Sequence, residues 1–176
     1  MSDAAPALRV LDVGCGDKKT PNAVGIDHRA LPGVDVVHDL DHMPWPLPDS
    51  AFDLIVCSHI IEHVADIPRF LRQVHRVGAP RARVRIETPH FSCLDSWTDP
   101  SHLHHLSSLS FNFFTENGYL SDGAVFRLER VGLTFRSSLT SQLGRLLFRR
   151  WPKQYEQSMA YMFPAMNIQA ELVVVK

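Results

Sequence analysis

The segment LDVGCGDKKTPNAVGIDHR, from Leu11 to Arg29, constrains the fold more than any other part of the chain. An aliphatic run leads into Gly14-Cys15-Gly16, and a second short apolar run ends at Asp27. This order is typical of the start of a parallel β-sheet whose glycine turn binds a nucleotide. Parallel neighbours usually need a dozen or more linking residues, most often a helix. Only the six residues 17–22 are available here.

The next connection is equally short, because residues 28–33 are all that separate Asp27 from the apolar run Val34–Asp39. At about 3.3 Å per extended residue, six residues reach roughly 20 Å, which returns the chain along one short strand. No length remains for a helix. The sequence therefore predicts a sheet whose first two crossovers lack helices.

The rest of the chain alternates between strand and helix periodicity. Strand-like runs cover Leu8–Val13, Ala23–Asp27, Val34–Asp39, Phe52–Ser58, Arg83–Thr88, Phe126–Phe135 and Ile168–Val175. From Ser58 to Val77 apolar residues recur at helical spacing, and Gly78 and Pro80 end the pattern. We therefore expect an α/β sheet wound from βαβ units.

The chain is long enough for one well-buried domain and short for two, with 176 residues of which 45% are hydrophobic. We expect a single domain over residues 1–176. Residues 136–167 mix aromatic and basic side chains, and we interpret them as a partly helical insertion that binds substrate or covers the sheet.

Composition excludes several classes of function. A net charge of −1 gives no general attraction to nucleic acid, so no nucleic-acid partner is expected. Cys15, Cys57 and Cys93 are far apart and form no disulfide framework or cysteine zinc site. No apolar run approaches the roughly 18 residues of a membrane span, and the N-terminal MSDAAPALRV lacks the features of a signal peptide. These features favour a cytoplasmic protein.

The glycine turn departs from a dinucleotide site in three ways. Asp27 follows Gly14 by thirteen residues, where such sites place the acid about 20 residues on. Lys19 stands where the third glycine would be, and Asp12 would repel a pyrophosphate. The same carboxylates suit a cationic ligand.

Four blocks of sequence resemble the class I S-adenosylmethionine-dependent methyltransferases in their small bacterial form, similar to methyltransferase type 11. These blocks are VLDVGCG, VGIDHR, VDVVHDLDHMPWPLPDSAFDLIVCSHIIEHV and TDPSHLHHLSSLSFNFF. The resemblance implies a Rossmann-like sheet of seven strands with the last one antiparallel, and S-adenosyl-L-methionine as the cofactor. The chain departs from the family at Lys18, where a third glycine is frequent, at GAPRA in place of a proline-glycine-glycine turn, and in its missing helices.

The resemblance also assigns a cofactor site. It implies that Asp27 binds the ribose and that Asp39 lies beside the adenine with Leu40 packed on the ring. The turn residues lie near the methionine part, and Ser58 and His59 line the space near the sulfonium. The predicted cofactor residues are Asp12, Gly14, Cys15, Gly16, Asp27, Asp39, Leu40 and Ser58. Carboxylates offset the charge of a sulfonium and an ammonium, and an ionised acid suits a ribose diol.

Methyl transfer needs no nucleophile on the protein, but a hydroxyl acceptor needs a base. His59 and His90 follow the carboxyl ends of two central strands and are the predicted bases. The resemblance predicts methylation of an unidentified small molecule at oxygen or nitrogen. The alternative from another class is a non-catalytic module that binds S-adenosylmethionine or a partner, which the missing helices and Lys18 would suit.

Two groups of histidines allow a metal interpretation. His59-Ile-Ile-Glu62-His63 matches the H-x-x-E-H pattern of a zinc hydrolase, with Glu129 the one tempting third ligand. The loop from His90 to Leu106 carries a second group, which could be a metal cluster, a set of bases or a solvated polar loop: His90, Asp95, Asp99, His102, His104 and His105. We expect no bound metal.

Strands without crossover helices need another cover. The runs before Ser58 are apolar on both faces, which is typical of parallel strands buried on both sides. We expect the insertion at 136–167 to cover them, or else a second subunit in a homodimer.

Overall fold

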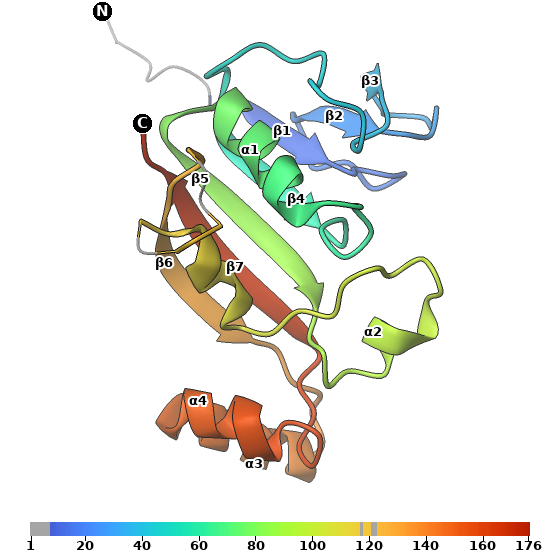
Figure 1. Cartoon of the computed structure of the whole chain (residues 1–176). Helices are drawn as coiled ribbons and strands as arrows, with labels where there is room; N and C mark the ends of the chain where they lie inside the picture. Colours follow the sequence, from blue (N-terminus) through green and yellow to red (C-terminus); the bar gives the residue numbers. More distant parts are fainter. Residues whose placement is uncertain (1–7, 117, 121–122) are drawn as a thin grey trace, which may run out of the picture.

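A seven-stranded sheet in the order β3-β2-β1-β4-β5-β7-β6 organises the molecule (Figure 1). The structure is a computed structural model that describes residues 8–116, 118–120 and 123–176. Within that part of the chain, β7 runs antiparallel to β5 and β6, and the neighbours from β3 to β5 are parallel. The strands are β1 Val10–Val13, β2 Val24–Asp27, β3 Val36–Val37, β4 Phe52–Ser58, β5 Gly78–Pro89, β6 Phe126–Leu133 and β7 Asn167–Val174. The predicted Rossmann-like sheet with an antiparallel last strand is confirmed.

The first two crossovers contain no helix, as predicted. Residues 14–23 and 28–35 cross between the strands as turns and bends. Gly14 donates its N–H to the Ile26 carbonyl at 2.8 Å, and Asp35 donates to the Gly25 carbonyl at 3.0 Å, so each connector is bonded to the strand beside it. The third predicted strand is much shorter than expected, because only Val36 and Val37 pair with β2.

Helix α1, Ile67–Val77, begins nine residues later than the periodicity predicted. Asp66 is its N-cap and accepts a hydrogen bond from Arg69 N at 2.8 Å, with Pro68 in the first turn. Residues 59–66 instead form a turn, so the prediction of a helix from Ser58 was wrong. Apolar residues of this turn pack into the core, and their spacing in the sequence happens to fit a helix.

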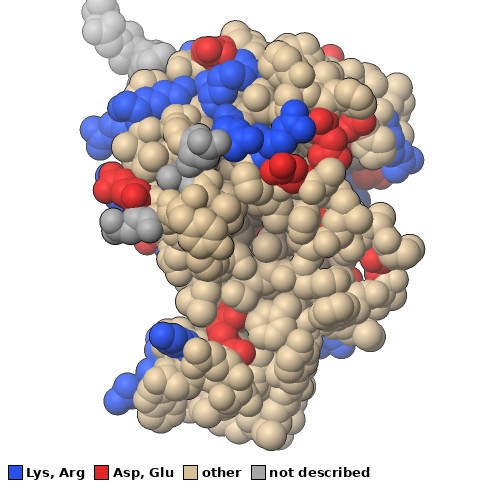
Figure 2. Space-filling model, in the orientation of Figure 1, with Lys and Arg blue, Asp and Glu red and all other residues tan. Residues whose placement is uncertain are grey.

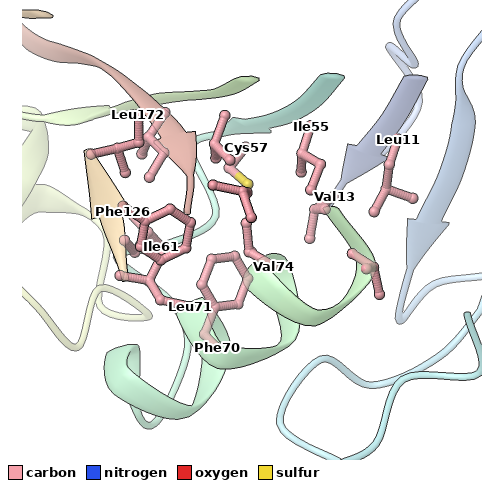
Figure 3. Packing of buried hydrophobic residues seen from close by; sticks show 14 of the residues in the cluster. Leu11, Val13, Ile55, Cys57, Ile61, Phe70, Leu71, Val74, Phe126 and Leu172 are labelled. Atoms are coloured by element: carbon pink, nitrogen blue, oxygen red, sulfur yellow. The ribbon is translucent and has the colours of Figure 1, made fainter. Parts of the chain in front are cut away.

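One face of the sheet carries the main core. Buried side chains of α1, among them Phe70, Leu71 and Val74, pack on Val13, Ile55 and other residues of β1, β4 and β7 (Figure 3). The short helix η1, Ser110–Phe114, adds Phe111 and Phe114 to the same core. Each fully buried aliphatic or aromatic side chain contributes about 1.5–3 kcal/mol, so this face holds most of the stabilising area.

The opposite face carries no helix among the described residues and changes character across the sheet. At β1 and β4 it presents a strip of half-buried apolar side chains, Val10, Leu54 and Val56. At β5 the outward positions become Arg83, Arg85 and Glu87, which give that strand a polar outer face. The apolar strip therefore lacks the cover that parallel strands usually have, and Val24 of β2 and Val37 of β3 are exposed as well.

The insertion at 136–167 packs beside β6 and β7 and does not cover β1 to β3 (Figure 1). It forms α3 Leu139–Arg150, α4 Pro152–Gln154 and η2 Tyr155–Met159. Tyr155, Ala160 and Ala165 are buried there in a separate cluster with Phe135. The expectation that this segment covers the N-terminal strands was wrong, because its apolar side chains are used at the far end of the sheet.

Charges of both signs are mixed on the face shown in Figure 2, where lysine and arginine side chains gather around α1 with acidic side chains among them. Among the described residues, no helix combines the length and the apolar character that a membrane crossing requires. A short helix α2, Asp95–Thr98, lies in the histidine-rich loop that projects beyond β5 (Figure 1).

Candidate functional site

The carboxyl ends of β1, β2 and β4 bring the predicted cofactor residues to one edge of the sheet. A cavity of about 490 Å³, called here the main cavity, opens at this edge. Its size lies within the range of small-molecule sites. It is lined by Gly14, Gly16, Asp27, His28, Arg29, Asp39, Leu40, Asp41, His59, Ile60, His63, Val64 and Ser101.

A second cavity of about 400 Å³, the turn cavity, lies on the other side of the glycine turn. Asp12, Cys15 and Ser58 line it, and Gly14 lines both cavities. All eight residues predicted for the cofactor thus line one or the other. The two cavities meet at the residue where the resemblance places the close approach of backbone to ligand.

Gly14 is required at this meeting point for two reasons. Its φ of +69° lies in the left-handed region, which L side chains rarely adopt. A Cβ added here would also stand 2.6 Å from the side chain of Ile60. Gly16 has a φ of +54° but open space around it, so only its backbone conformation demands glycine.

The carboxylate of Asp27 is held rigidly at the wall of the main cavity. Its Oδ2 accepts a hydrogen bond from Gly16 N and its Oδ1 accepts one from Arg29 N, both at 2.9 Å. His28 Nδ1 lies 3.4 Å from Oδ1. The glycine turn and the end of β2 therefore fix the acid that the sequence assigned to a ribose.

Asp12 and Asp39 take up different environments. Asp12 is buried on β1, and its Oδ2 accepts a hydrogen bond from Thr20 N at 2.6 Å, which ties the connector down. Asp39 is exposed, and the backbone N–H of Asp41, together with His42, lowers the pKa of its carboxyl. Leu40 is buried beside it, with its carbonyl bonded to the Trp45 indole at 3.0 Å.

The electrostatic balance of the two cavities favours a cation. Their walls carry five carboxylates against two basic side chains, Arg29 and Lys18. The acids are Asp12, Asp17, Asp27, Asp39 and Asp41. A ligand with a net positive charge is stabilised in such a site, and a nucleotide phosphate is repelled. This agrees with the prediction from Asp12 alone.

His59 lies where a base could reach a ligand. It follows β4 with a φ of +52°, a strained conformation for a residue with a side chain. Its imidazole lines both the main cavity and a third cavity of about 620 Å³, the outer cavity, which Pro89, Asp95, Asp99 and other loop residues complete. The carboxylate of Glu62, 3.3 Å from Nδ1, raises the pKa of His59.

His90, the other predicted base, is placed elsewhere. Its side chain has no exposed surface and lines none of the three cavities. Its Nε2 lies 3.4 Å from Glu156 of the insertion, and its Nδ1 is 2.7 Å from Ser92 Oγ. In this structure His90 holds the insertion against β5 and has no access to a ligand.

The structure also brings together residues that the sequence did not pair. Glu62 and His63, in the turn before α1, meet His102 of the histidine-rich loop. Glu129, the third ligand that a zinc hydrolase would have needed, is ion-paired with Arg127 on β6 and is not part of this group. Glu62 and His63 lie outside the helix that the sequence predicted from Ser58, since α1 starts at Ile67.

A sequence family described as a methyltransferase domain matches residues 2–153. A probable S-adenosylmethionine-dependent methyltransferase of Mycobacterium tuberculosis is 29% identical over 99 residues, which is 47% of this chain and 36% of that protein. Ajmaline N-methyltransferase of Rauvolfia serpentina is 44% identical over 46 residues, or 26% of this chain and 16% of that enzyme. The matched parts thus span well under half of either relative.

Solved structures show the same fold along nearly the whole chain. An S-adenosylmethionine-dependent methyltransferase from Archaeoglobus fulgidus superposes with a TM-score of 0.64 at 18% identity, covering 96% of this chain and 86% of that one. A second, from Mesorhizobium loti, gives a TM-score of 0.59 at 18% identity, with 94% and 90% covered.

Proposed function

The chain belongs to the methyltransferase family whose cofactor is S-adenosyl-L-methionine, and on this premise we propose that it transfers the methyl group to a small-molecule acceptor. The observation that carries the proposal is the placement of all eight predicted cofactor residues around two cavities that meet at Gly14.

Each cavity fits one part of the cofactor. Asp27 would hold the ribose diol, with Asp39 and Leu40 beside the adenine in the main cavity. Asp12, Cys15 and Ser58 would surround the methionine part in the turn cavity. The bound cofactor supplies a methyl group already activated by its sulfonium, so the protein has to align the acceptor, at about 3–3.5 Å, and keep water away.

The outer cavity is our candidate for the acceptor. It adjoins the main cavity at His59, the residue that lines both. A hydroxyl or amine held in the outer cavity would have the His59 imidazole within reach as proton acceptor. Asp95, Asp99 and Asn167 line the same space and would select a polar small molecule for O- or N-methylation.

A non-catalytic binding module is the second candidate, and one observation favours it. The wall of the turn cavity carries Lys18, where relatives often have glycine, and no crossover helix closes that side in the described residues. Such a chain could bind the cofactor without turning it over.

Calorimetry with S-adenosylhomocysteine tests the proposed site first. We expect saturable binding to one site, weakened about 10- to 100-fold by Asp27→Asn, because a hydrogen bond to a charged group is worth about 1.5–3 kcal/mol. Asp53→Asn is the matched control, since Asp53 pairs with Arg9 outside the cavities. Equal affinity of a folded Asp27→Asn protein would reject the assignment.

A turnover screen then separates the two candidates. Small phenols, hydroxy acids and amines are incubated with S-adenosylmethionine, and release of S-adenosylhomocysteine is measured. Release that depends on an acceptor and falls in His59→Gln supports the enzyme. Binding without release for any acceptor class favours the module.

A further inference from the structure

Three potential metal ligands converge between the main cavity and the outer cavity. Glu62, His63 and His102 each place one ligand atom within 4.8 Å of those of the other two. The group joins segments 39 residues apart: the turn after β4, and the loop after β5. The imidazole rings of His63 and His102 meet edge to face with centroids 4.7 Å apart.

Both imidazoles are fixed in the tautomer that a metal ligand needs. His63 Nδ1 lies 3.2 Å from the Ser101 carbonyl and 3.1 Å from Ser101 Oγ, a hydroxyl that donates its own proton to Asp99 Oδ1 at 2.6 Å. His102 Nδ1 lies 3.0 Å from the Ser96 carbonyl. A carbonyl oxygen only accepts, so each Nδ1 donates its proton there. Each Nε2 is left with a lone pair. A backbone carbonyl on the far nitrogen is the usual support of a metal-binding histidine.

The carboxylate of Glu62 is buried with one oxygen unsatisfied. The residue is 1% exposed, and its Oε2 accepts a hydrogen bond from Thr88 Oγ1 at 3.0 Å. Its Oε1 is buried and makes no hydrogen bond, with His59 Nδ1 at the ion-pair distance of 3.3 Å. A buried carboxylate oxygen without a donor is strongly destabilising unless a cation meets it.

We propose that Glu62, His63 and His102 bind a divalent transition-metal ion through one carboxylate oxygen and two Nε2 atoms. Two imidazoles and a carboxylate form a ligand set suited to zinc and related ions, and three protein ligands leave a coordination position open. The supporting hydrogen bonds to Thr88, Ser101 and Ser96 are already in place. The expectation of no metal rested on the lack of a third ligand and of supporting residues that could be recognised in the sequence. The sequence alone could not show that the fold brings His102 to Glu62.

The position of this site indicates its use. His63 lines the main cavity and His102 lines the outer cavity, so the open position would face an acceptor hydroxyl. That use rests on the proposed function, whereas binding of the ion does not. The ion would hold the acceptor oxygen and favour loss of its proton.

Titration with Zn²⁺, and separately with Co²⁺, tests the site on the full chain after treatment with a chelator. We expect one ion per chain, and visible absorption bands for Co²⁺ typical of nitrogen and oxygen ligands. His102→Gln and Glu62→Gln should each weaken binding more than about 100-fold, because loss of an outer-shell partner alone weakens it 10–100-fold. Thr88→Val removes a hydrogen bond to Glu62 but no metal ligand, so it should weaken metal binding by only about 10–100-fold.

His75→Gln is the matched control, since His75 bonds to the Val175 carbonyl at the opposite end of α1. One ion per chain that is lost in His102→Gln and retained in His75→Gln supports the site. Binding that is absent, or equal in all folded variants, overturns it. The affinity for S-adenosylhomocysteine is measured on the same samples, so failure of the metal site and failure of the cofactor site are seen separately.

Discussion

Single residues decide how the chain can turn after β1, and Gly14 is the clearest case. We expect Gly14→Ala to lower the free energy of unfolding by roughly 2–5 kcal/mol. About 1–2 kcal/mol comes from the left-handed backbone and about 1–3 kcal/mol from the contact with Ile60. The Cβ added in Gly16→Ala has no atom within 4 Å, so this variant should lose only the stability that the left-handed backbone costs. Urea unfolding of both variants measures the difference, and equal losses would contradict it.

The candidate cofactor residues could be assigned from the sequence because the motifs that carry the resemblance lie within or directly after the strands. Asp12, Gly14 and Asp27 need no tertiary information once β1 and β2 are recognised. His102 is different, because the loop that carries it has no periodicity and its place depends on contacts with the turn after β4. Leu103 and His104, for example, donate their N–H groups to the Glu62 carbonyl. For the same reason the sequence could not show that His90 is buried.

At the scale of elements, the insertion meets the segment after β5 in a buried contact between an imidazole and a carboxylate. His90 and Glu156 are 3.4 Å apart, with side chains 0% and 4% exposed. Burial opposes ionisation of Glu156, but His90 and the hydrogen bond from Ser108 N outweigh it and lower the pKa of its carboxyl from 4.5. The charged form is therefore the one that the folded state prefers.

This pair predicts a dependence of stability on pH. A lowered pKa stabilises the fold above the unfolded value of 4.5, and the contribution is lost as the pH falls through the folded pKa. Glu156→Gln should thus cost about 1–3 kcal/mol at pH 7 and progressively less below pH 4.5. Unfolding in urea from pH 3.5 to pH 7 checks this, with the exposed Glu129→Gln as control. A loss independent of pH would contradict the role of the charge.

The start of α1 shows why element boundaries were harder to predict than elements. Apolar residues from Ile60 to Val77 fit helical spacing, yet Asp66 caps the helix and residues 59–66 turn under the main cavity. Ile61 and Val64 are as buried as the helical residues, because the turn also packs on the core. The spacing of apolar residues therefore predicted correctly which side chains are buried. It could not show whether their backbone forms a turn or a helix.

At the scale of the whole molecule, the face of the sheet that carries no helix is our candidate for a contact between two copies of the chain. Its apolar strip of Val10, Leu54 and Val56 lies beside outward arginines and glutamates of β5 and β7. In a dimer with a two-fold axis, the apolar strips of the two copies could pack against each other. Arg85 of one copy could then lie near a glutamate of the other.

We therefore expect a homodimer in light scattering at micromolar concentration. Leu54→Glu places a charge in the apolar strip and should give a monomer, whereas Leu139→Glu on the exposed side of α3 should not. The two variants exchange the same residue types, so a general effect of charge is controlled. A wild-type chain that is monomeric at every concentration would reject this face as an interface.

The helix-free crossovers also bear on the order in which the sheet assembles. Leu11 and Val24, paired between β1 and β2, are 13 residues apart, whereas Glu87 and Gln169, paired between β5 and β7, are 82 residues apart. Closing the longer loop costs about 1.5–2 kcal/mol more in chain entropy, and distant pairings slow folding. The strands around the glycine turn can therefore meet early, through local contacts. The pairing of β7 with β5 should therefore come late and limit the rate of folding. The same step brings the two ends of the insertion together, because the insertion lies between β6 and β7 in the sequence.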